Sequence, residues 1–122
     1  MLPKILVFSL SLIIIDILWI RLHMLPKYIN WFNSINLKIT YNYVSIILVY
    51  FIMILVYPLF IQNKDKNKEL LKAASIGSII YGLYAFTVAG IFPKYGITFA
   101  FQEVLWGAFL YTIATFITQQ LS

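Results

Sequence analysis

The stretch Glu103-Val104-Leu105-Trp106-Gly107 places a carboxylate, a tryptophan and a glycine inside an otherwise apolar run. Near the other end of the chain, Asp16-Ile17-Leu18-Trp19 repeats a carboxylate three residues before a tryptophan, again inside an apolar run. Apolar runs of this kind are typical of transmembrane helices, in which an ionisable side chain is costly unless it meets a partner or water. The two acids therefore predict a polar cluster inside a small membrane protein.

The composition of the 122-residue chain indicates a one-domain membrane protein. Hydrophobic residues make up 62% of the sequence and the mean hydropathy is +0.90, whereas soluble domains contain about 45–50% apolar residues. A core this small cannot hide so much apolar surface, so lipid must cover the rest. The formal charge of +5 comes from lysines dispersed over loops, which we interpret as topology signals and headgroup contacts rather than a nucleic-acid surface.

Residue types that carry much enzyme and metal chemistry are scarce. The chain has no cysteine and one histidine, which excludes disulfides, thiolate sites and a multi-histidine metal site within one chain. We therefore expect no metal and no cofactor. The sequence also contains no nucleophile motif and no phosphate-binding loop, which makes an enzyme the least favoured class.

Four apolar segments predict four transmembrane helices that form an antiparallel, all-α bundle in a single domain, residues 1–122. The spans cover about residues 2–20, 41–61, 70–92 and 98–119. Pro3 suits the start of the first helix, and Arg21, His23 and Pro26 are expected to end it. Between the first two spans, aromatic residues recur at helical spacing opposite asparagines, which fits a short interfacial helix or an ordinary linker.

An even number of spans places both chain ends on the same side of the membrane. The positive residues of the loops divide almost equally between the two sides, and the densest cluster follows the second span: Lys64, Lys66, Lys68 and Lys72. Because lysine and arginine concentrate on the cytoplasmic side, we predict an integral, multi-pass protein with both termini in the cytoplasm.

Polar side chains from all four spans are predicted to meet in one layer. Asp16 lies late in the first span and Glu103 early in the fourth, and these spans run in opposite directions, so both acids reach a similar depth. The second span contributes Tyr43 and Ser45 to this layer. Tyr50 lies deeper, in mid-membrane, where its hydroxyl group needs a protein partner. The candidate proton or ion site comprises Asp16, Trp19, His23, Tyr81, Tyr84, Thr87, Gln102, Glu103 and Trp106.

The two acids have two open interpretations. An intramembrane acid is by default a functional site, and two neighbouring acids can share a proton. In the alternative, each acid accepts hydrogen bonds from tyrosine or tryptophan and locks the helices together. Small residues predict where helices pack closely. Ala74, Ser78 and Gly82 are spaced four apart along the third span, and Gly107 lies in the fourth.

Three motifs, Asp16-x-x-Trp19, Tyr81-Gly82-x-Tyr84-x-x-Thr87 and Glu103-x-x-Trp106-Gly107, resemble the pattern of an uncharacterised four-helix membrane family, domain of unknown function 2177. The resemblance covers essentially the whole chain, and the third motif is the most specific. That family usually has aspartate and asparagine where this chain has Ala85 and Val88, and aspartate in place of Glu103. The resemblance implies a four-helix membrane fold and no established activity; if the family's function requires the third-span aspartate, this chain has lost or altered it.

Three functions are compatible with these observations. The first is a proton- or cation-linked transporter or channel-like oligomer, with Asp16 and Glu103 as binding sites and Tyr81, Tyr84 and Gln102 along the path. The second is a structural or accessory subunit whose polar layer holds it to itself or to a larger complex. The third is a lipid-modifying enzyme. The expected partners are the lipid bilayer and further copies of the chain or a larger membrane complex, and not nucleic acid.

Overall fold

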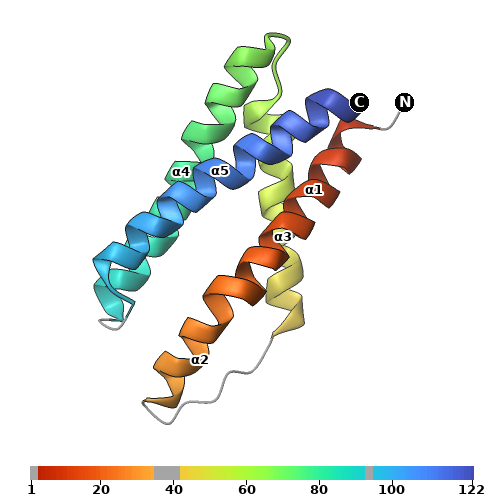
Figure 1. Ribbon diagram of the computed structural model, residues 1–122. Helices are drawn as coiled ribbons and strands as arrows, with labels where there is room; N and C mark the ends of the chain where they lie inside the picture. Colours follow the sequence, from red (N-terminus) through yellow and green to blue (C-terminus); the bar gives the residue numbers. More distant parts are fainter. Residues whose placement is uncertain (1–2, 35–41, 93–94) are drawn as a thin grey trace.

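The computed structural model describes residues 3–34, 42–92 and 95–122 (Figure 1). Along these residues the helical elements are α1 (Lys4–Trp19), η1 (Ile20–Met24), α2 (Leu25–Asn33), α3 (Tyr43–Val56), η2 (Tyr57–Ile61), α4 (Lys66–Ile91) and α5 (Ile97–Leu121). They join into four helices long and apolar enough to cross a membrane: Lys4–Asn33, Tyr43–Ile61, Lys66–Ile91 and Ile97–Leu121. The predicted all-α, four-span fold is confirmed.

The start of α1 and the end of α5 lie at the same end of the molecule (Figure 1). At this end a short turn joins η2 to α4, and the Asp65 carboxylate caps α4 by accepting bonds from the backbone N–H groups of Asn67 and Lys68 at 2.9 and 3.3 Å. Such a cap pairs N–H groups that the first helical turn leaves open. At the other end, Gly96 enters α5 with a φ of 75°, a left-handed conformation that favours glycine.

The first helix is longer than predicted. It continues through η1, a π-helical turn, into α2 and reaches Asn33, so the expectation that Arg21, His23 and Pro26 end it is wrong. Proline lacks an N–H group and its ring clashes with the carbonyl group four residues earlier. The wider π turn directly before Pro26 accommodates that clash. The interfacial helix or linker expected over residues 23–40 is therefore, up to Asn33, the end of this helix; residues 35–41 lie outside the described residues.

The other proline inside a span, Pro58, is also accommodated by a π turn. Pro58 lies in the π turn η2, which forms the last turn of the second span, where the sequence places it. A missing hydrogen bond is least damaging at a helix end. Both helices that contain a proline therefore remain continuous, and the four spans are not broken into shorter segments.

Helices α4 and α5 form the most extensive helix pair of the bundle. They approach closely at Gly77 and Gly107, where a Cβ atom on either glycine would overlap the carbonyl oxygen of the other. A Cβ atom on Gly107 would also lie 2.7 Å from the Tyr81 side chain. Of the small residues predicted to pack, Gly107 lies at this crossing. The other three each follow a residue on the inward face of α4 and are partly exposed: Ala74, Ser78 and Gly82.

This crossing leads to a prediction about stability. We expect Gly77→Ala to lower the free energy of unfolding by about 1–3 kcal/mol, because the added methyl group meets backbone atoms that cannot move aside. Reversible unfolding of the detergent-solubilised protein by a denaturing detergent, followed by circular dichroism, measures the change. Gly90→Ala in the same helix is the control, since no atom lies within 4 Å of its added Cβ atom. Equal losses in both variants would contradict the close crossing.

Helix α3 lies at the side of the bundle. It packs along α1, and its continuation η2 also contacts α4. The Phe8 ring of α1 stacks on Tyr57 of η2 with centroids 4.5 Å apart, and the Tyr111 hydroxyl group of α5 donates to the Met53 carbonyl oxygen of α3 at 3.0 Å. Much of the rest of α3 is apolar and exposed, as expected for a lipid-facing helix. A few polar contacts therefore fix the position of α3.

Candidate carboxylate–tryptophan site

The two acid-x-x-tryptophan motifs exchange partners. The Trp19 indole Nε1 of α1 donates to Glu103 Oε1 of α5 at 3.2 Å, and the Trp106 Nε1 of α5 donates to Asp16 Oδ1 of α1 at 3.3 Å. The two indole rings stack between the acids, with centroids 4.4 Å apart and planes 10° from parallel. The structure thus brings these four residues into one cluster.

The exchange follows from helix geometry. Residues three apart lie on the same helix face, so each motif presents its acid and its tryptophan together. Because α1 and α5 run in opposite directions, the acid of one motif lies level with the tryptophan of the other. The spacing alone leaves open whether a tryptophan bonds an acid of its own helix or of the neighbouring helix; the contact between α1 and α5 decides it.

Asp16 connects all four spans. Besides Trp106 of α5, its carboxylate accepts bonds from the Tyr50 hydroxyl group of α3 at 2.8 Å and the Tyr81 hydroxyl group of α4 at 3.1 Å. The side chain is only 5% exposed. Tyr50 thus finds the protein partner that its depth requires. Three neutral donors from three helices give Asp16 the geometry of an interhelical lock.

Glu103 has a different environment. It is 1% exposed, and Trp19 is the one donor to its carboxylate in the described part of the chain. A carboxylate has about four acceptor positions, so Glu103 keeps free capacity. Neither Glu103 nor Asp16 forms an ion pair with a cation among residues 3–34, 42–92 and 95–122. The cluster thus holds two buried acids and neutral donors.

A line of side chains leads outward from Glu103. The His23 ring packs on Trp19 with centroids 4.2 Å apart, and His23 Nε2 lies 3.2 Å from the Lys27 Nζ atom. Lys27 lies 4.5 Å above the centre of the Phe99 ring. Beyond it, an open hollow of about 390 Å³ between α2 and α5 is lined by Lys27, Phe99 and Gln102 among others. The hollow lies at the end of the molecule opposite the termini, and none of the four cluster residues lines it.

Aromatic side chains close the deep side of this hollow. The Tyr95 ring is 1% exposed and meets Phe99 edge to face at 4.7 Å. Burial raises the pKa of the Tyr95 hydroxyl group above its usual value, so the group stays neutral at ordinary pH. Tyr84, predicted for the site, shares a hydrogen bond of 2.9 Å with the Tyr28 hydroxyl group. Tyr84 therefore ties α4 to α2 rather than contacting either acid.

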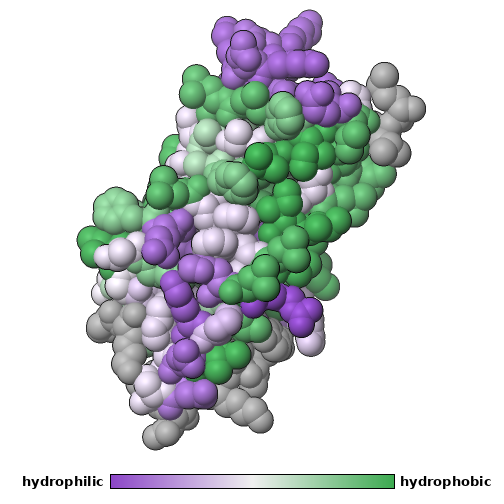
Figure 2. All heavy atoms as spheres, in the orientation of Figure 1, coloured by the Kyte–Doolittle hydropathy of each residue, from purple (hydrophilic) through white to green (hydrophobic). Residues whose placement is uncertain are grey.

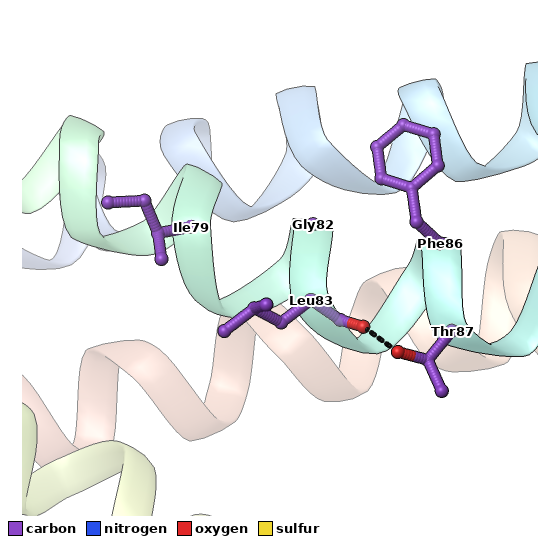
Figure 3. A pocket seen from close by; sticks show the side chains of 5 residues that line it. All are labelled: Ile79, Gly82, Leu83, Phe86 and Thr87. Carbon is purple, nitrogen blue, oxygen red and sulfur yellow. Dashed lines mark hydrogen bonds between the residues drawn. The ribbon is translucent and has the colours of Figure 1, made fainter.

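Thr87 is not brought to the cluster. Its hydroxyl group donates to the Leu83 carbonyl oxygen of its own helix, and both residues line an open hollow on α4 (Figure 3). The other residues along this hollow are Ile79, Gly82 and Phe86, which are apolar. Thr87 therefore lies in an apolar groove on the lipid-facing side of α4 and not in the predicted polar layer. Gln102 is exposed and faces the hollow beside Lys27.

Several polar residues of the structure were absent from the predicted site. Lys27 and Tyr28 fall in the segment expected to be an interfacial helix or linker, and the longer first helix brings them beside α5 and α4. Glu69 is 2% exposed although it follows a lysine-rich turn. No signal in the sequence marks this burial, because only the packing of α4 against α5 covers that face of the helix. The described residues include no group of three or more acids and histidines that could hold a metal ion.

The hydrogen bond from Trp19 to Glu103 predicts that removal of this indole donor destabilises the protein. We expect Trp19→Phe to lower the free energy of unfolding by about 1–3 kcal/mol more than Trp31→Phe, because it leaves the buried Glu103 carboxylate without its donor. Trp31 is a matched control, since it also packs among aromatic rings and donates to no described residue. Detergent unfolding followed by circular dichroism gives both values. Equal losses would show that ring volume, and not the bond, matters.

A protein-family model described as "Predicted membrane protein (DUF2177)" matches residues 1–120. No curated protein and no solved structure matches the chain. Ala85, which differs from the residue expected at this position from the resemblance, is fully buried beside Met24, Tyr95 and Ala100.

Proposed function

The chain belongs to the DUF2177 family of predicted membrane proteins, and from this premise we propose that it is a small proton-linked transporter in which Glu103 binds the moving proton. Asp16 holds the helices around that site. The proposal names one acid as the exchange site and the other as its scaffold, because their surroundings differ.

The observation that carries the proposal is a pair of buried acids that form no ion pair with any residue that the structure describes. An uncompensated charge inside a membrane is costly, and two acids in one cluster make it more so. Among the described residues, Asp16 accepts bonds from three donors and most of its acceptor positions are occupied, whereas Glu103 accepts one bond and keeps more of them free. Glu103 therefore has the capacity to exchange a ligand without releasing the helices from one another.

A proton fits this position better than a metal cation. Metal cations require several oxygen ligands arranged around a cavity, whereas a proton requires one acceptor and no extra space. Glu103 is almost completely buried and lies outside any metal-ligand group of the described residues. His23 and Lys27, which connect its tryptophan partner to the hollow, are groups that can pass a proton on.

Assembly of several copies is part of the proposal. The core of the four helices is filled by aromatic and aliphatic side chains, among them Phe8, Leu12 and Tyr111. One copy therefore has little room for a continuous water-filled path, and an oligomer would supply the rest of it. Native mass spectrometry from detergent gives the number of copies, and a monomer that still transports protons would remove this part of the proposal.

The test is proton flux through the purified protein. Proteoliposomes that contain a pH-sensitive dye are subjected to an imposed membrane potential, and the proposal expects faster acidification or alkalinisation than in protein-free liposomes. If folded native protein gives no flux with protons and none with sodium or potassium gradients, the transporter proposal fails.

One observation favours a second candidate, a structural or accessory subunit. Asp16 gathers donors from three other helices, which is what helix locking requires. If the native protein carries no flux, the lock would be the whole purpose of the cluster. Proteins that co-purify with the chain would then identify the complex it serves.

A further inference from the structure

A second polar site lies far from the carboxylate–tryptophan cluster. Hydrophilic residues gather at the end of the molecule that holds both termini (Figure 2). Within this end lies a small pocket of about 110 Å³. Its walls come from the start of α1, η2, the turn before α4, the first turn of α4 and the end of α5, and include Lys4, Lys64, Lys66, Glu69, Gln119 and Ser122.

Glu69 forms the floor of this pocket. Its Oε1 atom accepts a bond from the Gln119 side-chain amide at 2.9 Å, and its Oε2 atom accepts from the Asn63 backbone N–H group at 2.9 Å. The same Gln119 amide donates to the Lys66 carbonyl oxygen at 3.0 Å. These bonds join the last turn of α5 to the first turn of α4 and hold the pocket in shape. Both oxygens of the Glu69 carboxylate are therefore engaged by neutral donors.

No described acid pairs with the lysines that line the pocket, so their positive charges can interact with a bound anion. Lys4, Lys64 and Lys66 come from two separate parts of the chain and line the same pocket, and none of them forms an ion pair in the described residues. They outnumber the one buried acid beneath them. Like charges held around a small polar cavity repel one another, so an anion placed among them is stabilised.

We propose that this pocket binds the phosphate group of an anionic phospholipid. Apolar side chains are exposed on the same helices next to this end, namely Leu59 and Phe60 of η2 and Leu71 of α4. A phospholipid can place its acyl chains on that surface while its phosphate enters the pocket, whereas free phosphate uses the lysines alone. Basic pockets between transmembrane helices suit anionic headgroups for this reason.

The test compares two double variants that remove the same charge from neighbouring parts of the chain. Lys64→Gln with Lys66→Gln removes two pocket lysines, and Lys68→Gln with Lys72→Gln removes two lysines that do not line the pocket. Full-length protein is equilibrated with mixed micelles of phosphatidylglycerol and phosphatidylcholine, and native mass spectrometry measures the lipid retained. We expect selective retention of phosphatidylglycerol, which the pocket variant weakens by about tenfold or more and the control variant changes much less.

Three results would overturn the proposal. Equal weakening in both double variants would mean diffuse attraction to the lysine-rich end and not a pocket. Equal retention of phosphatidylcholine and phosphatidylglycerol would remove the charge argument. Displacement of the lipid by inorganic phosphate at a matching concentration would make free phosphate the ligand. Circular dichroism of each variant checks the fold, and Lys4→Gln, from a different helix, repeats the test with a single charge.

Discussion

Glu103→Gln is expected to abolish proton flux and to leave the protein folded. Glutamine has nearly the volume of glutamate and keeps a carbonyl oxygen that can accept the Trp19 indole bond, now 3.2 Å long. It cannot take up or release a proton near neutral pH. The substitution therefore separates the two roles of the side chain, since the structural bond remains and proton exchange is lost.

Flux in proteoliposomes and unfolding in detergent are measured on the same preparations. We expect flux at the level of protein-free liposomes and an unfolding midpoint equal to that of the native chain. Asp65→Asn is the matched control: it makes the same acid-to-amide change at an exposed helix cap, where asparagine caps as well as aspartate. Native flux from Glu103→Gln would assign proton exchange to another group, and loss of the fold would assign Glu103 to helix locking.

Asp16→Ala is expected to destabilise the fold by about 3–5 kcal/mol, a large share of the stability of an ordinary domain. The substitution leaves three partly buried donors without their acceptor: the hydroxyl groups of Tyr50 and Tyr81 and the indole of Trp106. Each unsatisfied buried group costs about 1–3 kcal/mol, and partial re-pairing among the donors reduces the sum.

The measurement is again unfolding in detergent, with two companion variants. Asp16→Asn keeps one carbonyl oxygen as an acceptor and should lose less than Asp16→Ala. Asp65→Asn makes the same change outside the cluster and should be neutral. The contact of α3 with the bundle should loosen first, because the Tyr50 bond is one of its few polar contacts. If Asp16→Ala unfolds like the native chain, Asp16 is not a lock.

Together, Glu103→Gln and Asp16→Ala distinguish proton exchange from helix locking, two roles that the sequence alone does not assign to one acid or the other. Both acids occur three residues before a tryptophan, in apolar helices, at matched depth. Within the described part of the chain, Asp16 has donors from three helices and Glu103 has one donor. A transporter predicts different results for the two acids, whereas a purely structural cluster predicts loss of stability from both.

Hydropathy and spacing establish the four spans, their alternating direction and the matched depth of Asp16 and Glu103. These follow from the length of an apolar run and from helical periodicity, which are local properties. The first helix is the exception. Pro26 and its charged neighbours predict an end near residue 20, but a proline stops a helix only if the backbone cannot widen around it, and η1 widens it.

The tertiary structure decides which residues of neighbouring helices contact each other, because these contacts depend on the rotation of each helix and on the distance between helices. It selects Gly77, rather than Ala74 or Gly82, as the partner of Gly107, because packing sets how far α4 turns about its own axis. It also makes the two tryptophans bond across helices. Spacing defines which residues share a face of one helix; only packing decides which face meets which neighbour, and so which acid gathers three donors and which keeps one.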